Sequence, residues 1–88
     1  DARLFKTDLR NSLLLNANLT GAYLSSALMQ GADLQWATLK QATLRYATNL
    51  TPKQIQSAKI DRQTKIPHYL EVNWISNDEF YCMVKENF

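Results

Sequence analysis

The chain has very few of the residues from which catalytic and metal sites are usually built. Its 88 residues include one cysteine, one histidine and two glycines. Because Cys82 is the single cysteine, the given sequence cannot form an internal disulfide framework. Cys82 also has no partner in a Cys-x-x-Cys or Cys/His zinc pattern. His68 has no nucleophile paired with it, and Gly21 and Gly31 are too far apart to form a phosphate-binding loop. We therefore predict no catalytic, cofactor-binding or metal site, and an enzyme is the least favoured class of function.

Long apolar runs are also absent. No stretch approaches the ~20 apolar residues that a transmembrane helix needs, and no signal-peptide pattern is present. We expect no membrane span and favour a cytoplasmic location, while a lumenal or periplasmic location stays open if a leader was removed. The first residue is Asp1, which already occupies the last position of a repeat, so we expect the solenoid or the protein to extend beyond this end.

What the sequence does contain is one pattern that recurs nine times in register between Ala2 and Tyr46. Each repeat consists of a small residue, a variable residue, a central leucine and two further variable positions. The central positions, which we predict to form the structural core, are Leu4, Leu9, Leu14, Leu19, Leu24, Met29, Leu34, Leu39 and Leu44.

A period of five residues fits neither a helix nor a flat strand. On an α-helix, residues five apart differ by about 140° around the axis, which scatters the leucines. In a strand, an odd spacing sends successive leucines to opposite faces. A chain that turns through about a right angle after each repeat keeps all the leucines inside. Four such sides close a coil of about 20 residues, and stacked coils pair through backbone hydrogen bonds about 4.8 Å apart.

The register predicts which residues stack and which form the corners. Residues one coil apart, such as Leu4 and Leu24, are expected to lie over each other in the interior. The corner positions include Asn11, Gly21 and Gly31, residue types that tolerate positive φ in tight turns.

The repeats resemble the pentapeptide-repeat family. Residues 17–21 (ANLTG) and 32–36 (ADLQW) carry the motif as it stands here, and the resemblance covers about half of the chain. It implies an all-β solenoid, a right-handed quadrilateral β-helix, of which these repeats supply about two coils. Leu13, Tyr23 and Leu28 depart from the family pattern, because Asp or Asn is usual at these outward positions.

We divide the chain into the pentapeptide-repeat β-helix at residues 1–50 and a helical cap and tail at residues 51–88. Thr51 as N-cap, Pro52 at the first helical position and Gln54 in a capping-box position predict a helix start. We expect this short helix to cover the open end of the last coil.

A second capping box at residues 76–79 (SNDE) predicts another helix that ends at about Lys85. Short α-helices would then cap the coil at its C-terminal end. The tail also resembles the segment that often follows the repeats in cyanobacterial members of the family.

An exposed apolar group is predicted on the third side of the square. Leu13 and Leu15 project from this side, and Trp36 lies at its corner. Exposed apolar patches of this kind usually mark a contact. The C-terminal tail, a second copy of the chain and a different protein are the alternatives for what covers it.

A second outward group lies on the first side, where Phe5, Tyr23 and Tyr46 accompany arginines. Aromatic residues mixed with arginine are common at protein interfaces and also stack on single-stranded nucleic acid. Because this side has only Arg3 and Arg45 and no basic stripe, we expect no nucleic acid partner.

The sequence favours a non-catalytic structural or protein-interaction module, such as the C-terminal scaffold or regulatory domain of a larger protein. Its protein partner is unknown, and a homodimer stays open. The family resemblance implies an alternative, a protein that imitates duplex DNA and protects a topoisomerase. That role needs acidic faces, whereas the formal net charge is +2 and only Asp8 and Asp33 are acidic in the outward ring of the repeats.

Overall fold

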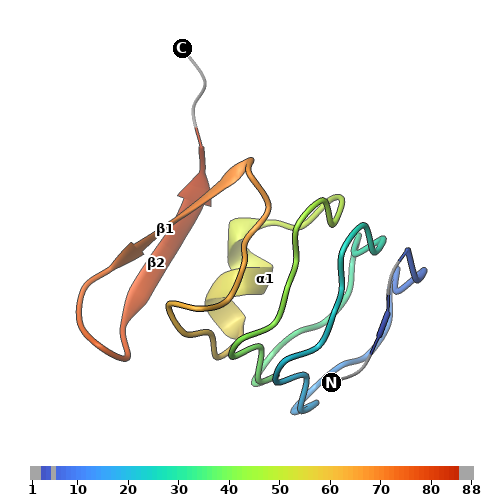
Figure 1. Cartoon of the computed structure of the whole chain (residues 1–88), viewed down its shortest axis with the longest axis horizontal. Coiled ribbons are helices and arrows are strands. Elements are labelled where there is room, and N and C mark those ends of the chain that lie inside the picture. The colour runs from blue at the N-terminus through green and yellow to red at the C-terminus, as the bar shows by residue number, and fades with distance from the viewer. Residues whose placement is uncertain (1–2, 5, 86–88) are drawn as a thin grey trace.

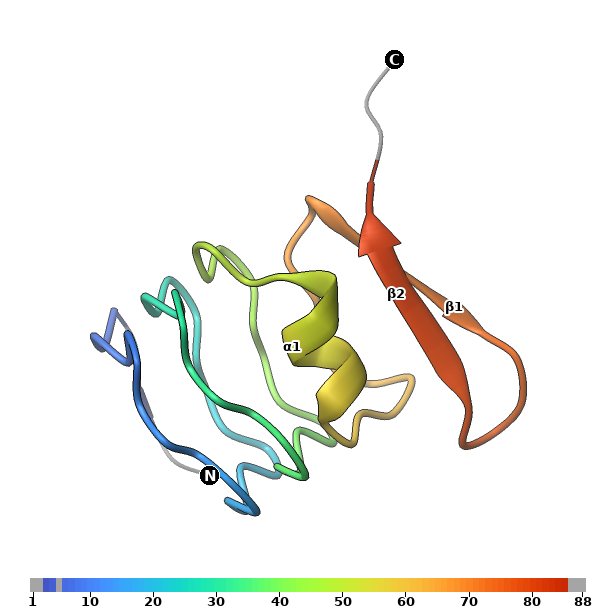
Figure 2. The same ribbon diagram turned by 180° about the vertical axis from the view of Figure 1, so that it is seen from behind.

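The structure, a computed structural model, describes residues 3–4 and 6–85. The first half of the chain winds into stacked coils, and the C-terminal part lies across one end of the stack (Figures 1 and 2). Parallel β-bridges join successive coils in four ladders, which define sides one to four. In chain order the ladders are Arg3–Tyr23–Thr43–Lys65, Asp8–Leu28–Thr48, Leu13–Asp33 and Asn18–Thr38–Lys59.

Backbone hydrogen bonds follow the predicted one-coil register. The N–H of Leu4 donates to the carbonyl of Tyr23 at 2.7 Å, and the N–H of Leu28 donates to the carbonyl of Thr7 at 2.9 Å. The ladders are isolated bridges, so continuous secondary structure in the described residues is limited to one helix and one two-stranded sheet.

The corners are built by residues with positive φ. The predicted corner residues Asn11, Gly21 and Gly31 have φ of 60°, 69° and 73°. Trp36 and Tyr46 occupy the same corner position with φ of 64° and 63°, although bulky side chains rarely adopt this conformation. The position in the coil, rather than the residue type, therefore fixes the backbone there.

Inward side chains form one continuous apolar core. Leu24, Met29, Leu34, Leu39 and Leu44 are completely or almost completely buried, as are the alanines beside them. Of the four central leucines of the first coil, Leu19 is buried, and Leu4, Leu9 and Leu14 are partly buried against this cluster.

The tail completes a third coil. Its apolar residues Leu50, Ile55 and Ile60 recur every five positions and are buried with the repeat leucines. Thr38 pairs with Lys59, and Thr43 pairs with Lys65. Each of these pairs is separated by more than the 20 residues that separate paired residues in the repeats. The tail therefore still stacks on the coil, but its sides are longer than five residues.

Helix α1 (Pro52–Ser57) takes the place of side three in this third coil. It starts as the sequence predicts, because the Thr51 side chain accepts from the N–H of Gln54, whose side chain accepts from the N–H of Thr51. Ile55 is its buried residue and anchors the helix to the core.

The second predicted helix is wrong: residues 80–84 form a strand. Strands β1 (Leu70–Trp74) and β2 (Phe80–Val84) make an antiparallel hairpin in which Val72 lies opposite Cys82. The Ser76 hydroxyl accepts from the N–H of Glu79, as in a helix cap, but here the bond closes the turn of the hairpin. The small sheet therefore covers the end of the coil, and α1, which the sequence predicted to cover it, forms a side of the third coil.

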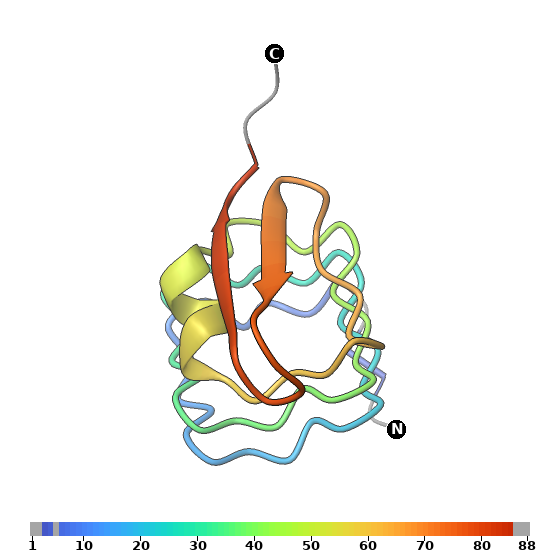
Figure 3. The same cartoon turned by 90° about the vertical axis from the view of Figure 1, so that its left-hand side faces the viewer.

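The hairpin lies across the C-terminal end of the coil, with β2 beside α1 (Figure 3). Leu70 is buried, and Val72, Trp74, Phe80 and Cys82 pack against the core cluster. The side-chain amide of Gln56 on α1 binds one carbonyl and one N–H group on the edge of β2. It donates to the carbonyl of Phe80 at 2.6 Å and accepts from the N–H of Cys82 at 2.8 Å.

Candidate interaction surfaces

Side three presents the apolar group that the sequence indicated. Leu13 is 78% exposed and Leu15 is 46% exposed on the first coil, and Trp36 is 56% exposed at the corner of the second. The hairpin lies over the end of the coil instead of over this side (Figure 3). Within the described residues these side chains are therefore left open to a partner.

A groove lies beside Trp36 and helix α1. It has a volume of about 700 Å³ and is lined by residues 30–36, Asn49, Thr51, Lys53, Gln54, Gln56 and Ser57. Some backbone carbonyls beside the groove already have hydrogen-bond donors. The Gln54 side-chain amide donates to the carbonyls of Met29 at 2.9 Å and Ala32 at 2.8 Å. The N–H of Trp36 donates to the carbonyl of Ser57 at 2.9 Å, which fixes the helix against this corner.

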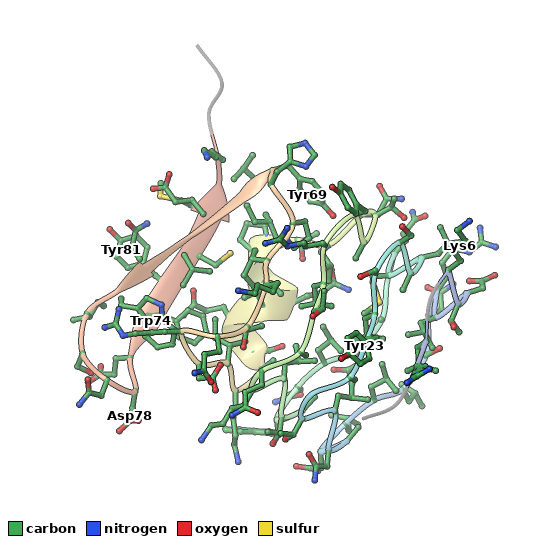
Figure 4. The ribbon with its side chains drawn as sticks, in the orientation of Figure 1. Lys6, Tyr23, Tyr69, Trp74, Asp78 and Tyr81 are labelled. Atoms are coloured by element: carbon green, nitrogen blue, oxygen red, sulfur yellow. The ribbon has the colours of Figure 1, made fainter. Side chains whose placement is uncertain are left out.

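Side one presents the two tyrosines that the sequence placed there. Tyr23 is 43% exposed and Tyr46 is 68% exposed. In Figure 4, Tyr23 lies midway along the coil, with Lys6 towards its N-terminal end. Phe5, the third aromatic residue expected on this side, lies outside the described residues.

The structure adds a lysine to side one that sequence reasoning missed. Lys65 extends the ladder of Arg3, Tyr23 and Thr43, although it follows Thr43 by 22 positions instead of 20. A shallow hollow of about 330 Å³ lies at this end, lined by Arg45, Tyr46, Thr64, Lys65, Ile66 and His68. No period of five could place these tail residues, because the side before Lys65 is longer than a repeat.

Acidic side chains on the coil are engaged by neighbours. Asp8 forms an ion pair with Arg10, with 2.7 Å between the carboxylate and guanidinium atoms. Hydrogen bonds from the Arg10 side chain and backbone lower the pKa of Asp8 to about 2. Asp61 accepts from the N–H groups of Gln41 and Gln63 and from the Thr64 hydroxyl.

The residues with reactive side chains are apart from one another. Cys82 faces the packed side of the hairpin, where burial raises the pKa of its thiol. The exposed His68 makes an edge contact with Tyr69, with 5.7 Å between ring centroids. Over residues 3–4 and 6–85, no group of His, Cys, Asp and Glu side chains is arranged to hold a metal ion.

Comparison with known proteins agrees with the geometry of the coil. A family model of pentapeptide repeats matches residues 2–41 in eight copies, one fewer than the nine units counted in register above. Residues 2–41 therefore belong to the pentapeptide-repeat family. Pentapeptide repeats imply a right-handed quadrilateral β-helix, in agreement with the four bridge ladders. No curated protein and no solved structure matches the chain.

Membership of the pentapeptide-repeat family bears on function only in general terms, because proteins of this family are generally non-catalytic. No helix in the described part of the chain is long and apolar enough to cross a membrane.

Proposed function

We propose that this pentapeptide-repeat protein is a non-catalytic protein-interaction module whose contact surface is side three. The observation that carries the proposal is the exposure of Leu13, Leu15 and Trp36 together on one side. Large apolar side chains grouped in this way mark contact sites on soluble proteins. The module would serve as a scaffold or as a regulatory domain of a larger protein.

Rigidity supports the same proposal. Each coil is held to the next by backbone hydrogen bonds on its four sides, so the three side chains keep a fixed spacing. A preformed apolar surface loses little conformational entropy when a partner binds, and this favours affinity.

The partner that we propose for side three is a second copy of the chain. Leu13, Leu15 and Trp36 are uncharged, so two copies of the group can meet across a two-fold axis without electrostatic repulsion. Asp33, the one charged outward residue of the repeats on this side, is partly buried, and the exposed Lys53 lies on α1 beside the groove next to Trp36.

Light scattering over a concentration series tests this contact. The wild-type chain is expected to dimerise, and Leu13→Asp with Trp36→Ser is expected to remain monomeric while keeping its folded spectrum. The matched control is Thr20→Asp with Tyr46→Ser. It introduces the same charge and removes one corner aromatic residue from other sides, so it should dimerise like the wild type.

A wild-type monomer at every concentration would overturn self-association. A dimer that survives the side-three substitutions would place the interface elsewhere on the molecule. Unfolding of the double variant would assign a structural role to these side chains and would also count against the proposal.

The alternative of DNA mimicry gains no support from the charges. The Asp8 carboxylate is paired with Arg10, and Asp33 accepts a hydrogen bond from the N–H of Gln35. A face that imitates a phosphate backbone needs unpaired acidic groups in rows.

A further inference from the structure

We infer that side one is a second contact surface, which binds an acidic polypeptide segment at the hollow between Arg45 and Lys65. This inference is independent of the proposed dimer, because the hollow lies on a different side from Leu13 and Trp36. It rests on the charges and aromatic residues that the third coil and the chain directly after it bring to this side.

The basic residues of side one come from three parts of the chain. Arg3 and Lys65 are the end residues of one ladder of three bridges, and Arg45 lies two positions after Thr43 of that ladder. Strand-like rungs about 4.8 Å apart place the whole ladder within roughly 15 Å. All three basic side chains are exposed.

The hollow itself combines three kinds of contact. Arg45, Lys65 and His68 supply nitrogen donors, Tyr46 supplies an exposed aromatic ring, and Ile66 supplies an apolar wall. Arg binds carboxylate groups through two parallel hydrogen bonds, and Lys adds a point charge beside it. A glutamate or aspartate side chain fits this set of donors.

The acidic side chain of Asp61 lies beside the hollow and is not part of its lining. The hollow has no acidic residue in its lining. Asp61 lies close by, since its carboxylate is bonded to Thr64, but that carboxylate also accepts from the backbone of Gln41 and Gln63. All three of these bonds reach Oδ1, which holds the carboxylate in the corner, and within the described residues no ion pair joins Asp61 to Arg45 or Lys65.

A short acidic peptide agrees with this surface better than a nucleic acid does. The basic surface extends over roughly 15 Å, about the length of four or five extended residues. The chain as a whole has a formal net charge of only +2. Nucleic-acid-binding domains usually carry a larger basic excess that follows the backbone beyond one small patch.

Fluorescence anisotropy with a labelled peptide in which glutamate alternates with serine tests the inference on the full chain. The wild type is expected to bind the peptide, and the affinity is expected to fall as salt is raised. Arg45→Glu with Lys65→Glu should weaken binding by roughly tenfold or more, because two attractions become repulsions. A thermal melt should show that this variant remains folded.

The matched control is Lys40→Glu with Lys59→Glu, which changes the net charge equally at exposed lysines on side four. It should keep the peptide affinity within about twofold of the wild type. Equal losses in the two variants would overturn the site, since attraction would then depend on net charge alone. Failure of the wild type to bind the peptide would overturn it too, as would tighter binding of an oligothymidylate of similar length.

Discussion

The hydroxyl of Tyr69 donates a hydrogen bond to the backbone carbonyl of Ala47 at 2.6 Å and accepts one from the N–H of Leu50 at 3.1 Å. Tyr69 directly precedes β1, and Ala47 and Leu50 flank the point at which the repeat pattern stops. One side chain thus satisfies two backbone groups at the irregular turn and attaches the hairpin to the coil.

Removal of that hydroxyl should weaken the junction. We expect Tyr69→Phe to lower the free energy of unfolding by about 1–3 kcal/mol, because it leaves a part-buried carbonyl and a part-buried N–H without their partner. Urea denaturation measures the change. Tyr81→Phe is the control, since this tyrosine is exposed on the outer face of the hairpin and should change stability by less than about 0.5 kcal/mol. Equal effects of the two substitutions would contradict a specific role for the Tyr69 hydroxyl.

Sequence reasoning succeeded where a short period decides the structure. The repeat spacing predicted the one-coil register that pairs Arg3 with Tyr23, because each five-residue unit specifies its own turn. The start of α1 was predictable too, since Thr51, Pro52 and Gln54 form the cap through local contacts alone.

It failed in the tail, where local signals are ambiguous. Ser and Asp hydrogen-bond nearby N–H groups both at helix starts and in turns, so residues 76–79 do not distinguish a helix from a hairpin. The alternation of apolar and polar residues in Leu70–Trp74 did carry a strand signal, with Glu71 and Asn73 facing away from the core side. The position of Lys65 on side one depends on the lengths of two irregular sides, which no repeat specifies.

Gln56 should protect the edge of β2 that faces α1 from hydrogen exchange. We expect Gln56→Ala to accelerate hydrogen exchange at the Cys82 amide and to lower stability by about 1 kcal/mol, because that N–H loses its acceptor. Exchange measured by NMR reports the amide individually. Gln63→Ala is the control, since the side chain of Gln63 is exposed on a loop and its loss should leave the Cys82 amide unchanged. Unaltered exchange in Gln56→Ala would show that the edge is protected by packing instead.

Gly31 should be intolerant of a methyl group for two separable reasons. Its φ is +73°, and a Cβ atom would clash with Oδ1 at the end of the Asn11 side chain in the coil before it. We expect Gly31→Ala to destabilise the fold by roughly 1–3 kcal/mol, as read from urea denaturation. Adding Asn11→Gly removes the clashing side chain and should restore part of the loss. No restoration in the double variant would assign the whole effect to the backbone conformation.

Asp61 should make the third coil sensitive to acid. Burial acts to raise the pKa of Asp61, but hydrogen bonds from the N–H groups of Gln41 and Gln63 and from Thr64 outweigh it and lower this pKa below its ordinary value. A carboxyl group with a lower pKa in the folded than in the unfolded chain stabilises the fold at neutral pH. That stabilisation is complete above the unfolded pKa of about 4 and is lost as the pH falls through the folded pKa.

Urea denaturation of the wild type and Asp61→Asn at several pH values measures this contribution. We expect the variant to be less stable at neutral pH and the gap to close as the pH falls through the folded pKa, where the wild-type carboxyl group also becomes neutral. Asp78→Asn, at an exposed position in the hairpin turn, should stay close to the wild type at neutral pH. If the Asp61→Asn gap persisted in acid, the loss would reflect the geometry of the amide, because the wild type would by then have lost the charge as well.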